Sequence, residues 1–575
     1  MKARLLTLAL LSLATALLLA FGFNETSPTP LKLQVPKKTV SCGPDWQQLE
    51  QYFEEMSIPP IPGSGTHKWK ISTNSDSAQF YFNQGINMYY CFHIIESMAS
   101  FKKAAHFDST AAMVQWAQAL AYGPNINDLG YAASPEALNT TARALALSGK
   151  NSSKEKALIQ VMQVRYSTDS TASREALNQL YADKMKELYH KYPTDADIAA
   201  LYADALMLQH PWDLWNINGT AKAWTPAIRE VLEKLLAKYP DHPGANHYYI
   251  HVMEGSPYPG KARPSAERLG RITPALSHTV HMPSHIYLRT GDYNKGVTVN
   301  ENAVASYRKL IPVYSPVTAN DFLYVIHNLH MQVNNAIMAG RMAYSVRTSL
   351  ETVKSIPPDY LGAPGGLASY MQNINMLPVL TDVRFARWQE LLDHPQPPVT
   401  QVYGNVLFHF GRGMALAHLA RPGEAKEELK ALQQLLTDSV LQLPFTPFSP
   451  AIEGAKVAND LLAGTIALKE KNYPEAIAAY SRAAAREESM VYTEPRDWIL
   501  NPKHYLGQAY MLAGQFANAE KIFRKDLEYN NENAWALRGL YQSLIAQKKK
   551  EAGTVLTRFT NAAQKADVKI SAAIL

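Results

Sequence analysis

Residues 506–523 read LGQAYMLAGQFANAEKIF, and their spacing decides the fold. Apolar residues recur with a helical period on both sides of a short turn at 513–515, which predicts two antiparallel helices. Gly507 on the first helix is small, whereas Phe523 on the second is large. Small residues let paired helices approach and large ones fill the space between them. This stretch therefore predicts a closely packed helical hairpin.

The same pattern returns along the chain with a period of about 34 residues. Within 506–523, leucine, glycine, tyrosine, alanine and phenylalanine stand at places 7, 8, 11, 20 and 24 of one period. Looser copies include Gly85, Gly413 and Gly464. This code resembles the tetratricopeptide (TPR) repeat and covers about residues 78–545. The resemblance implies an all-α fold, in which TPR-like helical-hairpin repeats form a right-handed superhelix, or solenoid.

Several short stretches between and within the predicted helices extend the resemblance to an exported bacterial TPR family of uncertain activity. They are residues 122–127, 244–247, 281–285, 324–330 and 492–498. The first and last of them are rich in Asn, Asp and Pro, which favour turns closed by side-chain hydrogen bonds. We expect those two loops to be structural, with lining of the groove as the alternative.

Composition and the N-terminus narrow the prediction further. With 47% hydrophobic and 18% charged residues, the chain is typical of a folded globular protein. A formal charge of +6 without a dense basic stripe gives no reason to propose nucleic acid as a partner. Lys2 and Arg4 precede an apolar run over 5–21, which is the layout of a cleaved secretory signal. We expect an exported protein, periplasmic or extracellular, with no membrane span after cleavage; an uncleaved anchor is the alternative.

These features divide the chain into four segments. They are a signal peptide at 1–23, an N-terminal extension at 24–77, degenerate TPR-like repeats with a His-rich concave site at 78–395, and C-terminal TPR repeats at 396–575. Cys42 and Cys91 are the two cysteines. In an oxidising compartment they either form one disulfide or stay unpaired, and their separation in sequence favours neither outcome.

Histidines are concentrated in the middle of the chain, where eight of the 17 lie between residues 242 and 330. In TPR proteins, places 2, 5, 9 and 12 of the first helix line the concave wall of the superhelix. Repeat frames that begin at Pro243, Ser277 and Ile326 put a set of His and Glu side chains on those places. The set is His247, His251 and Glu254, then His278, His281 and His285, then His327 and His330. Three successive repeats therefore direct histidines at one groove.

Histidine is the commonest nitrogen ligand of protein-bound metals, and two histidines four residues apart on a helix can chelate one ion. The first choice of ligands is His247, His251, His281 and His285. A second set, Glu254, His278, His327 and His330, could belong to a second ion. Zinc, copper and iron all remain open, because no thiolate lies nearby. The helix should end at Gly255, leaving room for a substrate at the groove.

Other polar residues carry weaker signals. Asp204 should face the same groove, but any concave wall carries some carboxylates. His93 and Glu96 would reach the site only if the superhelix curls round. His210 should pack in a structured loop, and His242 should lie at the surface.

Two functions compete. In the first, a divalent transition metal activates water or oxygen, so that the protein is a metal-dependent hydrolase or oxidoreductase with Glu254 as a ligand or general base. In the second, the protein is a metal-free TPR scaffold that binds a peptide or an envelope protein partner in its groove, because TPR proteins are usually scaffolds. A hydrogen-bonded histidine seam between helices would be a purely structural reading. An open coordination position beside a deep pocket would favour the enzyme.

Overall fold

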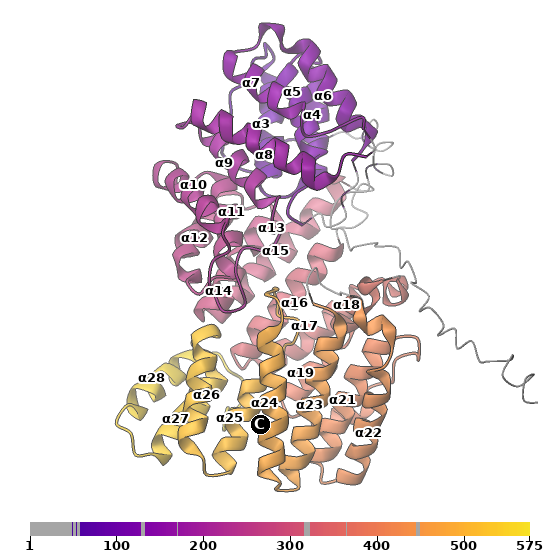
Figure 1. Cartoon of the computed structure of the whole chain (residues 1–575), viewed down its shortest axis with the longest axis vertical. Coiled ribbons are helices and arrows are strands. Elements are labelled where there is room, and N and C mark those ends of the chain that lie inside the picture. Colours follow the sequence, from indigo (N-terminus) through magenta and orange to yellow (C-terminus); the bar gives the residue numbers. More distant parts are fainter. Residues whose placement is uncertain are drawn as a thin grey trace, which may run out of the picture. The chain divides into compact units, whose positions relative to one another are not determined.

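The structure is a computed structural model, shown in Figure 1. It describes residues 46, 49, 53, 58–127, 131, 133–169, 171–314, 322–363, 365–443 and 449–575. Contacts divide the chain into residues 1–37 and a compact unit formed by residues 38–575. The expected signal peptide and Cys42, and with it the question of a disulfide, lie outside the described residues. None of the described helices combines the length and apolar character needed to cross a membrane.

Within the described ranges the fold is entirely helical, apart from one isolated β-bridge between Trp215 and Ala221. The α-helices are α3 (Asp76–Tyr90), α4 (Ile94–Phe107), α5 (Ala112–Ala121), α6 (Pro135–Leu147), α7 (Ser153–Met162), α8 (Arg174–Lys191), α9 (Ala196–Met207), α10 (Thr225–Lys238), α11 (Pro243–Glu254), α12 (Arg263–Ile272), α13 (Ser277–His281), α14 (Pro283–Thr290), α15 (Tyr293–Tyr314), α16 (Phe322–Met338), α17 (Met342–Lys354), α18 (Gly366–Asn375), α19 (Leu377–Arg384), α20 (Trp388–Asp393), α21 (Val402–His418), α22 (Pro422–Leu435), α23 (Ala451–Lys469), α24 (Tyr473–Ser489), α25 (Pro502–Leu512), α26 (Phe516–Tyr529), α27 (Ala534–Ala546) and α28 (Ala552–Ala562). Short 3₁₀ helices occupy Ser148–Lys150, Pro259–Ala262, Pro358–Gly362 and Ser439–Gln442.

Neighbouring helices pair and then stack on the next pair in chain order, as a solenoid requires. The pairs with the most extensive contact are α3 with α4, α15 with α16, α21 with α22, and α23 with α24, and α25 packs on both α24 and α26. Figure 1 shows α21 to α28 side by side in this manner. The all-α fold and the TPR-like helical hairpins predicted from the sequence are confirmed.

The glycines of the repeat pattern pack directly against its aromatic rings. A Cβ atom on Gly507 would lie 2.4 Å from the ring of Phe523, and one on Gly539 would lie 2.3 Å from the same ring. The earliest copy repeats this arrangement, because a Cβ on Gly85 would lie 2.4 Å from Phe101. These glycines are required because the aromatic ring of the paired or following helix occupies the space of a side chain.

Gly539→Ala should destabilise the C-terminal repeats by about 1–3 kcal/mol, because the new methyl group overpacks the Phe523 ring. The matched control is Gly553→Ala in α28, where a Cβ would meet no atom within 4 Å. That substitution should stabilise by about 0.4–1 kcal/mol, because it lowers the entropy of the unfolded chain. Urea unfolding of both variants measures the difference; equal stabilities would contradict the packing explanation.

Two helix boundaries differ from the predicted repeat frames. The third frame begins at Phe322 and not at Ile326, so His327 lies further inside α16 than expected. The second frame does begin at Ser277, but its first helix is divided into α13 and α14 at Met282 and Pro283. Proline has no N–H to continue the helix, which explains the division.

Candidate metal centre

Helix α11 carries the first part of the site on one face. Its N-terminus is capped by His242, whose Nδ1 accepts a hydrogen bond from the N–H of Ala245 at 3.2 Å. Pro243 at the first helical position is pre-organised for a helix start. The helix ends at Glu254 before Gly255, as predicted. His242 is buried, and the expectation that it lies at the surface was wrong, because its ring both caps α11 and contacts Asp197.

The first histidine group joins α11 to α13. The Nε2 atom of His247 lies 3.1 Å from Nε2 of His251 and 3.1 Å from Nε2 of His278. All three side chains are buried. Phe92 packs over them, with its ring centroid 4.5 Å from that of His247 and 5.8 Å from that of His278. Three ring nitrogens from two helices therefore point at one small volume.

Hydrogen bonds at the opposite ring nitrogens fix the protons of this group. Nδ1 of His247 lies 2.7 Å from the carbonyl oxygen of Tyr90, and Nδ1 of His251 lies 3.1 Å from Oε1 of Glu254. Both partners are acceptors, so each Nδ1 carries a proton, and Nε2 of a neutral ring presents a lone pair. Burial lowers the pKa of His247 well below its usual value, with the neighbouring His251 as the next cause. The Nε2 atoms of His247 and His251 therefore face each other at 3.1 Å, a contact that a metal ion or a proton between the two rings would satisfy.

The second group joins α13 and α14 to α16. The Nε2 atom of His281 lies 2.7 Å from Nε2 of His285 and 3.0 Å from Nε2 of His327. Nδ1 of His281 donates to Oδ1 of Asn300 at 2.6 Å, since the amide nitrogen of Asn300 is used on the carbonyl of Gly296. This group again has three Nε2 atoms directed inward and at least one lone pair among them.

His285 differs because two carboxylates face its outer nitrogen. Its Nδ1 is in contact with Oε2 of Glu254 and lies 2.7 Å from Oε2 of Glu494. Burial alone would lower the pKa of His285, but Glu494 and Glu254 outweigh it and raise the pKa to about 10. The ring is thus held as an imidazolium, and its Nε2 proton takes the position that a metal ion would otherwise occupy against His281.

The two groups are immediate neighbours. Ring centroids of His251 and His285 are 6.0 Å apart, and so are those of His278 and His281. Glu254 connects them, because one carboxylate oxygen contacts His251 and the other contacts His285. A carboxylate behind a histidine ligand fixes the ring and makes its inner nitrogen a stronger donor. The arrangement could hold two ions next to each other, each on three imidazole nitrogens.

Sequence reasoning placed His247, His251, His278, His281, His285 and His327 in the site, and the structure brings these six together. His330 is buried, but among the described residues it belongs to neither group, and its Nδ1 has no hydrogen-bond partner there. Burial lowers the pKa of His330 to about 3. Asp204 lies away from both groups and accepts a hydrogen bond from Tyr89 at 3.2 Å.

Two other residues behave differently from the expectation. His93 and Glu96 do reach the site, since Nε2 of His93 accepts the N–H of His278 at 3.3 Å while its Nδ1 faces Glu96.

Glu494 was not singled out from the sequence, and only its place in the unusual loop 492–498 could have drawn attention to it. Burial raises the pKa of Glu494 to about 7, although His285 opposes the shift.

A third cluster, formed by His67, Asp197 and His242, serves as an internal comparison. Nε2 of His67 lies 2.8 Å from Oδ1 of Asp197, and the hydroxyl of Tyr90 donates to the same oxygen at 2.9 Å. Because Nδ1 of His242 accepts from Ala245, its proton is on Nε2 and faces Asp197. Every nitrogen that faces the centre of this cluster can be a donor to the carboxylate. The proton on Nε2 of His242 faces the carboxylate at 3.5 Å without forming a hydrogen bond.

A cavity of about 1230 Å³ opens beside the centre. His251 and Glu254 form part of its wall, and the ring of Trp212 stands 5.2 Å from that of His251. The opposite wall comes from the C-terminal repeats and includes Trp498 and Tyr529. The site thus lies next to a space large enough for a small-molecule substrate.

No protein-family model matches the sequence, and no curated protein matches it either. Among solved structures, the human IFIT1 dimer with m7Gppp-AAAA is 11% identical over 87% of this chain and 92% of that chain, with a TM-score of 0.30. Yeast Tom70 is 12% identical over 85% and 93%, with a TM-score of 0.27. Scores this low support no shared arrangement beyond stacked helices. The helix pairs and the glycine and aromatic packing within them show TPR-like helical hairpins stacked into a solenoid.

Proposed function

We propose that the protein is a metal-dependent enzyme whose two histidine groups each hold one transition-metal ion beside the large cavity. The observation that supports this most directly is that Nε2 of His247 and Nε2 of His251 face each other at 3.1 Å, while the outer nitrogen of each ring faces an acceptor. A buried contact of this kind is repulsive unless a proton or a metal ion lies between the rings, and the metal ion is proposed because a third imidazole, that of His278, is directed at the same point. The signal-like N-terminus supports export of the protein.

The donor set favours copper. Each group directs three imidazole Nε2 atoms inward, and His285 would release its Nε2 proton when an ion binds. No carboxylate oxygen is among the inward-facing atoms of either group in the described residues. Imidazole suits zinc, copper and iron, but copper binds such nitrogen sites most tightly among the divalent first-row metals. A pair of copper ions supplies oxygen activation when bound, so we propose an oxidoreductase. A zinc-loaded pair would make the same site a hydrolase.

In this proposal the surrounding residues position the metal ligands and line the cavity that would hold the substrate. Glu254 is engaged with His251 and His285, so it positions ligands and does not act as the general base. Arg289 supports the backbone at the end of α11, because its Nη1 donates to the carbonyl of Glu254 at 2.6 Å. Trp212 and the other aromatic residues of the cavity wall offer apolar surface for a substrate.

Elemental mass spectrometry on untagged protein tests the proposal. We expect about two metal equivalents per wild-type chain and about one in a His281→Ala, His285→Ala double variant, with helicity unchanged by circular dichroism. If copper is found, oxygen uptake should depend on it; if zinc is found, hydrolysis should be screened instead. Absence of metal from the wild type, even after incubation with copper and zinc, would overturn the proposal and favour a peptide-binding scaffold.

A further inference from the structure

The loop between α24 and α25 reaches from the C-terminal repeats to the histidine centre. Its residue Glu494 lies with Oε2 2.7 Å from Nδ1 of His285, on the side away from His281. Both side chains are almost entirely buried, with 2% of the Glu494 side chain and 4% of the His285 side chain exposed. This carboxylate is more than 200 residues away in sequence from the histidine it faces. Its position therefore depends on how the loop is held.

An aromatic stack holds the middle of the loop. The guanidinium group of Arg496 lies 3.5 Å from the ring centroid of Tyr529, while that of Arg289 in α14 lies 3.8 Å from it. Arg496 also pairs with Glu487 at the end of α24. Arg289 in turn donates to the carbonyl of Glu254. Tyr529 thus lies between the loop and the helix that carries His285.

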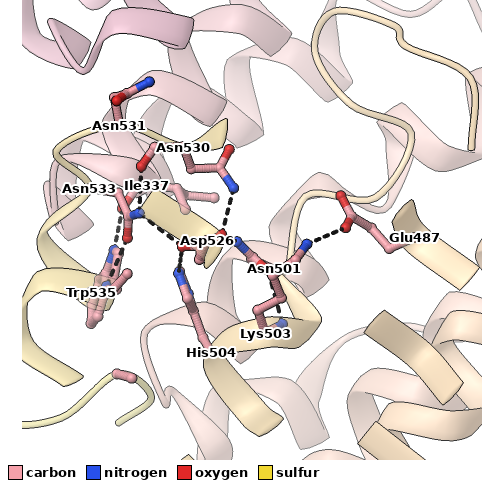
Figure 2. A network of polar contacts seen from close by, with 12 residues as sticks. Ile337, Glu487, Asn501, Lys503, His504, Asp526, Asn530, Asn531, Asn533 and Trp535 are labelled. Atoms are coloured by element: carbon pink, nitrogen blue, oxygen red, sulfur yellow. Dashed lines mark hydrogen bonds and ion pairs between the residues drawn. The ribbon is translucent and has the colours of Figure 1, made fainter. Parts of the chain in front are cut away.

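Buried Asp526, on the same helix as Tyr529, holds the end of the loop (Figure 2). Its carboxylate accepts from Asn501, from Nε2 of His504 at 3.0 Å, and from Nδ2 of Asn533 at 3.0 Å. Asn501 is the last residue of the loop and caps α25. Lys503 in the first turn of α25 pairs with Glu487 at 3.1 Å. Both ends of the loop are therefore tied to helices of the C-terminal repeats.

We propose that Glu494 is a positioning residue for the second histidine group, so that the C-terminal repeats complete the metal centre and control its affinity. This inference rests on the proposed metal function. Glu254 contacts a histidine of each group, whereas Glu494 contacts only His285. A carboxylate at the outer nitrogen orients the ring and increases its donor strength, and its loss typically weakens metal binding 10–100-fold. Glu494 should therefore affect the second ion and leave the first unchanged.

The test uses full-length protein titrated with Co(II), followed by visible absorption and by calorimetry. We expect the wild type to bind about two ions. Glu494→Ala should weaken one of them about 10–100-fold and change only that ion's spectrum. Glu494→Gln should restore part of the affinity, because its amide oxygen can take the place of the carboxylate oxygen that lies 2.7 Å from Nδ1 of His285. The matched control is Glu528→Ala, an exposed carboxylate on the same cavity wall, which should change neither ion.

A double-mutant comparison assigns the effect to the second group. In a background with His281→Ala and His285→Ala, adding Glu494→Ala should leave the remaining ion's affinity unchanged, because its only metal-site contact is gone. If the wild type binds no Co(II), the proposed function itself fails. If the wild type binds two ions and Glu494→Ala binds both with the same affinity and spectrum, the metal centre stands and this inference is overturned.

Discussion

Glu254→Ala should weaken both metal ions at once, by about 10–100-fold each, whereas substitutions of single histidines act on one group. The reason is geometric, since the two oxygens of this carboxylate contact Nδ1 of His251 and Nδ1 of His285, which belong to different groups. Burial alone would raise the pKa of Glu254, but His285 and His251 outweigh it and lower the pKa to about 2. The group is therefore an anion that stabilises both rings.

Metal titration of Glu254→Ala, with Asp197→Ala as the matched control, measures this effect. Asp197 is also a buried carboxylate in contact with two histidines, His67 and His242. That cluster shares no residue with the two histidine groups, so Asp197→Ala should lower stability but still bind about two ions. If both variants bind two ions with wild-type affinity, Glu254 does not link the two groups. If both lose metal, the effect comes from damage to the fold.

Asp526→Ala should destabilise the C-terminal repeats by about 3–5 kcal/mol, because it leaves several buried donors without an acceptor. Those donors include His504, whose Nδ1 in turn faces Nη1 of Arg384 at 3.4 Å. Burial alone would raise the pKa of Asp526, but His504, Lys503 and Asn530 hold it well below its usual value. Since the folded pKa is lowered, this stabilisation is complete above about pH 4 and is lost as pH falls further.

Hydrogen exchange of α25, α26 and α27 follows this loss directly, at neutral pH and at about pH 3. At neutral pH the amide protons of the variant should exchange faster than those of the wild type. Acidification to about pH 3 should lower the protection of the variant less than that of the wild type. Glu528→Ala, which removes an exposed carboxylate from the same helix, should stay within about 0.5 kcal/mol of the wild type. Unchanged exchange in Asp526→Ala would contradict the structural role of this network.

The helical hairpins could be predicted because the code that specifies them is local. Gly507 and Phe523 stand a fixed distance apart in sequence, and their contact follows from one turn between two helices. The positions on the concave wall were also assigned from spacing within single repeats. For this reason six of the seven proposed histidine ligands meet in space. His330 is the exception, because it lies on α16 with His327 but belongs to neither group.

The partners of the histidines could not be predicted by the same reasoning. Glu494 reaches His285 through a loop whose path is set by Tyr529, Asp526 and the stacking of later repeats. The proton positions depend on the carbonyl of Tyr90 and on Asn300, which no spacing rule connects with the histidines. Sequence periodicity identifies which side chains share a face, but tautomers depend on contacts between distant segments.

The division of the histidines among α11, α13, α14 and α16 has a consequence for how this chain can vary in evolution. A solenoid usually tolerates the gain or loss of a repeat, because each repeat touches only its neighbours. Here the two groups take their nitrogens from three consecutive helix pairs, so duplication or deletion of a unit within 243–338 would separate the rings. The middle of the chain is therefore fixed in repeat number, and the later repeats are tied to it, because Nε1 of Trp535 donates to the carbonyl of Ile337 and the carboxylate of Asp567 accepts from the N–H groups of Met342 and Ala343.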